Sequence, residues 1–250
     1  MTLRIAVAGK GGVGKTTCSA LLLRALALSG VRPLLAVDAD PNANLHLLLA
    51  LPFPGALGSL REERRAAAGG AVPLADRIAS EVGRRVSEGE AVDLIAMGRG
   101  EGPGCYCYVN NLLREALDRI EAGYRAVVMD NEAGMEHLSR RSVRRIDHLV
   151  LVGDPSPRGA SAVAALRDLA AELALPVGNT WLLLNRPYGV PGRSAPEALG
   201  LPILAALPHD PRLPSWEGEG RSFLDLPPGE SPAADAVADA LRTRLLGSAA

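Results

Sequence analysis

The stretch from Gly9 to Thr17 constrains this chain more than any other, because it combines closely spaced glycines with two lysines and two threonines. An apolar run from Leu3 to Ala8 precedes it, and a run typical of a helix follows from Ser19 to Leu28. A strand before and a helix after are the context that the phosphate-loop motif G-x-x-x-x-G-K-[ST] requires. The motif residues are Gly9, Gly14, Lys15 and Thr16. This context predicts a nucleotide-binding α/β protein with a mostly parallel sheet and helices on both faces.

The chemistry of the loop follows from its residue types. Glycines let backbone N–H groups turn toward phosphate oxygens at the positive end of a helix. We expect Lys15 to bridge the β- and γ-phosphates of ATP, and the Thr16 hydroxyl to ligate Mg²⁺. The loop residues predicted to contact the nucleotide are Gly9, Lys10, Gly11, Gly12, Val13, Gly14, Lys15, Thr16 and Thr17. The alternative, a chance glycine-rich turn, leaves the flanking strand and helix unexplained.

Lysine is used in this chain only inside the loop. Of the 27 basic residues, Lys10 and Lys15 are the only lysines, and all the others are arginines. A lysine is a compact point charge on a flexible stem, whereas an arginine is a wide planar fork, so a tight phosphate cradle can distinguish them. The general motif explains Lys15 but not Lys10.

Length and composition limit the function classes. A chain of 250 residues with 48% hydrophobic residues can bury one core, so we predict a single domain spanning residues 1–250. The net charge of −1 and the 3% of aromatic residues disfavour a nucleic-acid partner. No signal-peptide pattern follows Met1, and no apolar stretch reaches the ~20 residues of a membrane span. We therefore expect a cytoplasmic protein without stable membrane association.

Carboxylates follow the predicted strand from Leu34 to Val37. Asp38 and Asp40 stand where that strand ends, and an open parallel sheet places its ligand chemistry at this end. Asp38 could hold Mg²⁺ through water, and Asp40 could orient the attacking water or accept its proton. The alternative is that these residues start a helix, and both interpretations can hold together.

A second carboxylate closes the predicted strand from Arg125 to Met129. Asp130 fits the second magnesium-binding motif of phosphate-loop proteins, and Gly134 supplies a turn able to sense the γ-phosphate. Glu132 either orders water or is a solvated loop charge.

Two thiols lie close together in a glycine-rich turn from Gly100 to Tyr108, before a helix predicted from Val109 to Glu121. Cys105 and Cys107 fill only half of a tetrahedral site. If the turn lies on the axis of a two-fold dimer, both subunits together give a four-sulfur site suited to zinc or another thiophilic metal. The alternatives are a pair of small buried residues or a redox pair.

The nucleotide base is expected at the ends of two later strands. The run from Trp181 to Leu184 ends at Asn185, whose amide can both donate to and accept from an adenine edge. The run from Ile203 to Leu207 leads into a loop that could flank the base. The predicted contacts are Asn185, Arg186, Pro208 and Asp210. The other predicted elements are a helix from Leu74 to Val86, a strand from Ala91 to Met97, a strand from Ile146 to Val152, a helix ending near Leu173 and a C-terminal helix from Pro232 to Leu246.

Three motifs together resemble the deviant phosphate-loop dimeric ATPases, which include the nitrogenase iron protein and the septum-placement and plasmid-partition ATPases. The motifs are Lys-Gly-Gly-Val-Gly-Lys-Thr-Thr, Asp-Ala-Asp-Pro, and the Asn185 and Pro-x-Asp pair. In that class the additional lysine, here Lys10, reaches the phosphates of the other subunit. The resemblance implies an ATP-dependent homodimer with Lys10, Lys15 and Asp40 as the catalytic residues.

Two further features resemble the CooC-type accessory ATPases of nickel-containing carbon monoxide dehydrogenase. These are the Gly-Glu-Gly-Pro-Gly-Cys-Tyr-Cys turn and the segment from Asp130 to His137, although that family usually has a threonine where Asn131 stands. The resemblance implies Ni²⁺ or Zn²⁺ held between subunits by Cys105 and Cys107, ATP turnover linked to nickel insertion, and the apoenzyme as client. The alternatives are a positioning or partition ATPase that cycles on a membrane or nucleoid, and an iron-protein-like electron carrier with an intersubunit cluster.

Overall fold

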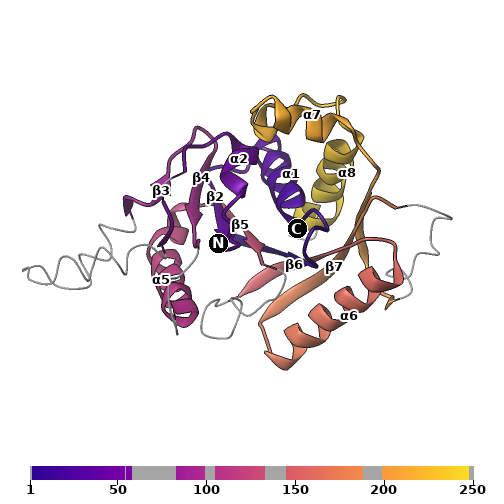
Figure 1. Cartoon of the computed structure of the whole chain (residues 1–250), viewed down its shortest axis with the longest axis horizontal. Helices are drawn as coiled ribbons and strands as arrows, with labels where there is room; N and C mark the ends of the chain where they lie inside the picture. Colours follow the sequence, from indigo (N-terminus) through magenta and orange to yellow (C-terminus); the bar gives the residue numbers. More distant parts are fainter. Residues whose placement is uncertain are drawn as a thin grey trace, which may run out of the picture.

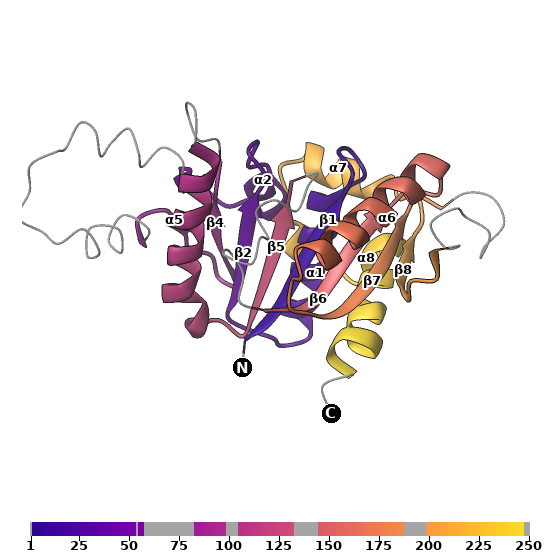
Figure 2. The same ribbon diagram turned by 90° about the horizontal axis from the view of Figure 1, so that it is seen from below.

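A twisted sheet forms the centre of the molecule, with helices packed on both of its faces (Figures 1 and 2). The structure is a computed structural model that describes residues 2–53, 55–57, 83–98, 105–132, 145–187 and 199–247, with the backbone alone over 105–112. Within these ranges the sheet has eight strands in the order β3-β4-β2-β5-β1-β6-β7-β8. All neighbouring strands are parallel except β3, which is antiparallel to β4. The predicted fold class is therefore confirmed.

The strands are β1 (Leu3–Gly9), β2 (Leu34–Ala39), β3 (Val86–Ser87), β4 (Val92–Ala96), β5 (Ala126–Asn131), β6 (Ile146–Gly153), β7 (Val177–Asn185) and β8 (Ile203–Leu207). The α-helices are α1 (Lys15–Leu28), α2 (Leu45–Leu49), α5 (Cys105–Ile120), α6 (Pro157–Glu172), α7 (Arg212–Gly218) and α8 (Pro232–Ala240). Shorter helical turns are η2 (Glu121–Gly123), η5 (Phe223–Asp225) and the π-helical η6 (Leu241–Leu246).

The strand sequences explain why both faces are covered. β2 and β5 are buried along their whole length, as expected for central parallel strands with helices on both sides. Side chains of β1 alternate between the two layers: Ile5 and Val7 pack with α1 and α8, while Ala6 and Ala8 pack with α5 and α6. The two hydrophobic layers fix the sheet between them, so the carboxyl ends of its strands form a stable platform for a site.

Several predicted boundaries differ from the structure. The predicted helix from Leu74 to Val86 lies mostly outside the described residues, but its end is wrong, because Val86 and Ser87 pair with β4 as an edge strand. The helix predicted from Val109 begins at Cys105, since no glycine or proline interrupts the chain after Gly104. The C-terminal helix leaves α geometry after Ala240 and continues as a π-helix.

Candidate functional site

The glycine-rich loop lies at the carboxyl end of β1, next to the ends of β5 and β6. A turn closes it, with the Val13 N–H donating to the Lys10 carbonyl at 3.3 Å. Gly12 and Gly14 have left-handed φ values of 75° and 95°. A Cβ atom at Gly11 or Gly12 would meet nothing within 4 Å, so this side of the loop is open. The loop thus presents its backbone to free space, as a phosphate cradle requires.

The two lysines have different environments. Lys15 is only 7% exposed, and its Nζ lies 3.4 Å from the Lys10 carbonyl oxygen, so it lies across the inside of the loop. Lys10 is exposed. Lys15 therefore lies inside the site, whereas Lys10 lies on the surface of the protein.

An open cavity of about 490 Å³ lies against the loop. It brings together the predicted residues Gly11, Gly12, Gly14, Lys15, Thr16, Thr17 and Asp40. It is also lined by Asn42, Asn44, Leu48, Glu132 and Glu217, of which only Glu132 was considered from the sequence. The loop and the first acidic segment therefore face the same space.

Asp38 and Asp130 are neighbours in register on β2 and β5. Both are 1% exposed. Burial, helped by the nearby Asp38, raises the pKa of Asp130 to about 7, although Thr16, Lys15 and Ser19 act in the opposite direction. Burial likewise raises the pKa of Asp38 to about 6. A cation bound between the two carboxyl groups would favour their ionised forms, so this pair is suited to hold one.

The oxygen atoms available there suit Mg²⁺. Ser19 Oγ donates to Asp130 Oδ1 at 3.3 Å, whereas the buried Oδ2 of Asp130 has no hydrogen-bond partner. Thr16 also faces this carboxyl group. A hydroxyl and a carboxylate, completed by phosphate and water oxygens, are the hard ligands that Mg²⁺ prefers. The residues present therefore fit the ion.

Asp38 also has the structural role that the sequence left open. Its Oδ1 accepts a hydrogen bond from the Asp40 N–H at 3.1 Å, and its Oδ2 accepts one from the Leu45 N–H at 2.8 Å. Leu45 is the first residue of α2. Asp38 thus anchors the turn that carries Asp40 into the cavity, where Asp40 Oδ1 accepts from the Asn42 N–H at 2.8 Å.

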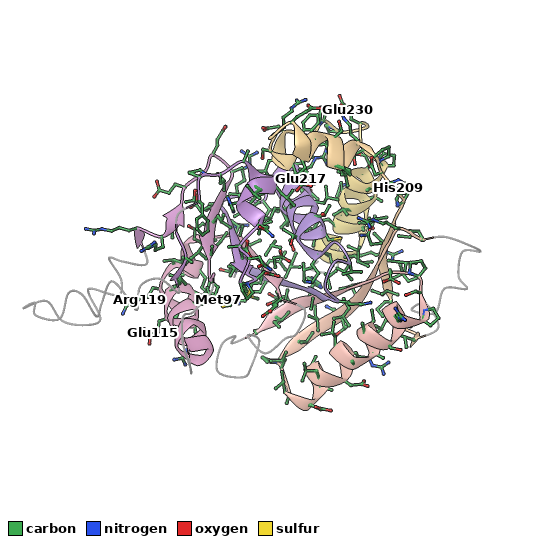
Figure 3. All side chains as sticks on the ribbon, in the orientation of Figure 1. Met97, Glu115, Arg119, His209, Glu217 and Glu230 are labelled. Carbon is green, nitrogen blue, oxygen red and sulfur yellow. The ribbon has the colours of Figure 1, made fainter. Side chains whose placement is uncertain are left out.

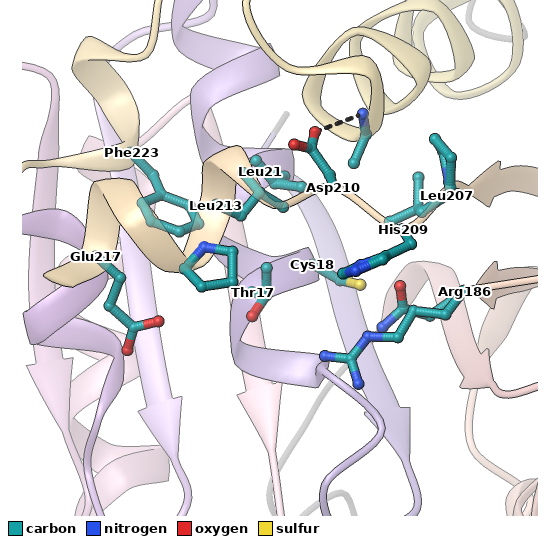
Figure 4. A pocket seen from close by; sticks show the side chains of 14 residues that line it. Thr17, Cys18, Leu21, Arg186, Leu207, His209, Asp210, Leu213, Glu217 and Phe223 are labelled. Carbon is teal, nitrogen blue, oxygen red and sulfur yellow. Dashed lines mark hydrogen bonds between the residues drawn. The ribbon is translucent and has the colours of Figure 1, made fainter.

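A smaller pocket of about 130 Å³ lies beside the start of α1 (Figure 4). It brings together the predicted base contacts Asn185, Arg186, Pro208 and Asp210. Its deeper wall is formed by Cys18, Leu21, Leu207, Leu213, Phe223 and Ala233. An apolar wall with polar groups around it is what a flat heterocyclic base needs.

The structure gives the Asp210 carboxylate a different task from the predicted base contact. Oδ2 accepts from Ser231 Oγ at 2.6 Å and from the Ala233 N–H at 3.2 Å, while Oδ1 accepts from the Arg212 N–H at 2.9 Å. Figure 4 shows its bond to Ala233. Asp210 therefore ties the starts of α7 and α8 together, and its contact with a base stays a prediction.

Glu217 was not among the predicted site residues, because the sequence did not predict α7. Figure 3 shows Glu217 and His209 on the α1 side of the sheet, away from Glu115 and Arg119 on α5. Glu217 lines both cavities. The buried Trp216 anchors α7: its indole N–H donates to the Ser222 carbonyl at 2.8 Å, and Arg221 stacks 3.4 Å from the ring centroid. The spacing of Leu213 and Trp216 was the available signal for this helix.

Some predicted features lie outside the described residues. The side chains of Cys105 and Cys107 are among them, as is the segment from Gly134 to His137. In the parts of the chain that are described, no group of three or more His, Cys, Asp or Glu residues could hold a metal ion. The same parts contain no helix with the length and apolar character needed to cross a membrane.

Residues 5–223 match the model of the CobQ/CobB/MinD/ParA nucleotide binding domain. An uncharacterized ATP-binding protein of Methanocaldococcus jannaschii is 36% identical over 232 residues, which cover 89% of this chain and 91% of the relative. The carbon monoxide dehydrogenase accessory protein CooC of Rhodospirillum rubrum is 32% identical over 258 residues, 97% of each chain.

Solved structures share the fold. A ParA family ATPase from Chlorobium tepidum superposes with a TM-score of 0.74 at 20% identity, covering 98% of both chains. The MinD cell division protein of Aquifex aeolicus gives a TM-score of 0.70 at 21% identity, covering 99% of this chain and 97% of that protein. At these identities the likeness concerns the fold alone.

Proposed function

The chain is an ATPase that belongs to the CobQ/CobB/MinD/ParA nucleotide-binding domain family, and on this premise we propose that it works as a dimeric metallochaperone for carbon monoxide dehydrogenase. It would couple ATP binding and hydrolysis to the capture and release of nickel at a site shared between subunits. One observation carries the proposal: the 32% identity with CooC extends over 97% of both chains, in a sequence that carries the Cys105-x-Cys107 pair.

The cavities suggest how the nucleotide lies. The triphosphate would occupy the 490 Å³ cavity on the loop, and the base would occupy the 130 Å³ pocket beside α1. Thr16 and Asp130 would hold Mg²⁺, with Asp38 close by. The ion supplies charge neutralisation for the phosphates. Asp40, held in the cavity by its turn, is placed to orient a water molecule or accept its proton.

The exposure of the two lysines supports a division of labour. The buried Lys15 serves the phosphates of its own subunit. The exposed Lys10 remains available to a second subunit, so ATP binding would draw two chains together. Hydrolysis would remove the γ-phosphate that Lys10 contacts and loosen the dimer.

Nickel is the cargo in this proposal. Two thiolates per subunit, brought together by dimerisation, give the four sulfur ligands that a thiophilic metal accepts. Opening of the dimer would halve this ligand set, which links metal release to ATP turnover.

Metal analysis of the anaerobically purified, ATP-bound dimer tests the proposal. We expect one nickel or zinc ion per two chains in the wild type, and loss of tight binding in Cys105→Ser/Cys107→Ser. Cys18→Ala is the matched control, because this thiol is buried within α1, and it should keep the wild-type stoichiometry. One ion per chain, or equal affinity in the double variant, would contradict the shared site.

The same preparation tests the alternatives. Iron with sulfide and a visible colour would indicate an iron-protein-like electron carrier. Pelleting with liposomes or DNA that depends on ATP at physiological salt would indicate a positioning or partition ATPase instead.

A further inference from the structure

Asn185, the last residue of β7, contacts the phosphate loop directly. Its Nδ2 donates a hydrogen bond of 2.7 Å to the Val13 carbonyl, across 172 positions of sequence. Asn185 lines the smaller pocket and not the larger cavity. The side chain of Asn185, a predicted base contact, therefore holds the backbone of the phosphate loop at Val13.

The hydrogen bond fixes the direction of a neighbouring N–H group. Val13 and Gly14 share one trans peptide, in which the carbonyl and the N–H point in opposite directions. Because Asn185 holds the Val13 carbonyl on its own side, the Gly14 N–H points away from Asn185. Gly14 lines the larger cavity, which Asn185 does not line.

Close contact adds to the hydrogen bond. A Cβ atom at Gly14 would lie 2.6 Å from Asn185 Nδ2, so the amide sits against the backbone of the loop. Asn185 is itself fixed, since it pairs in register with Leu207 of β8. The carboxyl end of β7 thus supports the backbone of the phosphate loop through Asn185.

We propose that Asn185 is a positioning residue for the triphosphate, acting through the Val13 carbonyl to aim the Gly14 N–H at the phosphates. The inference rests on the proposed binding of ATP. An amide has a second N–H and an oxygen, and these remain for a base in the adjoining pocket. One side chain thereby couples occupancy of the base pocket to the shape of the phosphate loop.

The affinity for magnesium tripolyphosphate, measured by calorimetry, tests the inference because this probe has neither base nor ribose. Asn185→Leu keeps the shape of the side chain and removes the donor. We expect it to bind tripolyphosphate about three- to tenfold more weakly than the wild type, with a similar midpoint of thermal unfolding. His209→Ala is the control, because His209 lines the base pocket but not the larger cavity. The affinity of this variant for tripolyphosphate should stay within about twofold of that of the wild type.

Equal tripolyphosphate affinity in folded Asn185→Leu, with a loss seen only for ATP, would reduce Asn185 to a base contact and overturn the inference. If the leucine variant does not fold, Asn185→Ala is measured by the same criterion. A wild-type protein that binds neither ATP nor tripolyphosphate would instead refute the proposed function.

Discussion

Replacing Asp130 by asparagine should remove a pH-dependent cost to the stability of the nucleotide-free protein. The pKa of this buried carboxyl group rises from its ordinary 3.8 to about 7 on folding. The native state therefore binds the proton more tightly than the unfolded chain does. Stability from this group is complete below about pH 4 and is lost progressively as the pH rises through 7. Asparagine does not titrate, so the variant lacks this loss.

The size of the effect follows from the two pKa values. Between pH 5 and pH 8 they correspond to a loss of about 2–3 kcal/mol in the free energy of unfolding of the wild type. Asparagine adds a cost of its own, because its amide nitrogen replaces the unpartnered Oδ2. That cost is about 1–3 kcal/mol and does not depend on pH. The difference in free energy of unfolding between the variant and the wild type therefore changes with pH only through the titration of Asp130.

Urea unfolding in EDTA, followed by tryptophan fluorescence, measures this difference at pH 5 and pH 8. Asp130→Asn should gain about 2–3 kcal/mol relative to the wild type over this interval. Asp154→Asn is the control: the bond from Ser156 lowers the pKa of Asp154, so this group does not titrate between pH 5 and 8. Parallel stability profiles for Asp130→Asn and the wild type would refute our account of the buried carboxyl.

Three further pairs of substitutions test separate parts of the structure. Lys10→Ala should retain nucleotide binding but lose ATP-dependent dimerisation in sedimentation experiments. Lys15→Ala should instead weaken ATP binding by about 10- to 100-fold. Equal dimerisation of Lys10→Ala and the wild type would contradict the proposed roles of the two lysines. Gly14→Ala should lower stability by about 1–3 kcal/mol, because φ is left-handed and Asn185 occupies the space, whereas Gly11→Ala should be nearly neutral in the same thermal unfolding assay. Ser231→Ala removes the cap on the Ala234 N–H and the bond to Asp210, so it should cost about 1–2 kcal/mol in urea unfolding, against less than about 0.5 for the exposed Ser215→Ala.

The sequence was sufficient to predict the parts of the fold that depend on local pattern. The apolar runs that became β1, β2, β5, β6 and β8 are visible because central parallel strands are buried on both faces. Their carboxyl ends could be assigned to the site because the phosphate loop identifies which end of the sheet carries chemistry. In the structure the loop and Asp40 line one cavity.

The features that could not be predicted from the sequence depend on contacts between segments that are distant in the chain. The two residues of β3 form a strand only because β4 lies beside them. The bond between Asn185 and Val13 joins positions 172 residues apart. Asp210 has a predicted role as a base contact, yet its oxygens join α7 to α8, and no local pattern around it reveals Ser231 as a partner.

The burial of Cys18 gives the protein an internal reporter of its own opening. This thiol is fully buried on the wall of the 130 Å³ pocket, and burial raises its pKa to about 12. The chain has three cysteines, so a thiol-specific reagent applied to the folded protein can modify at most Cys105 and Cys107. Modification of Cys18 then requires a transient opening around α1, and its rate measures how often that opening occurs. ATP bound in the pocket should slow this third modification, which mass spectrometry can follow residue by residue.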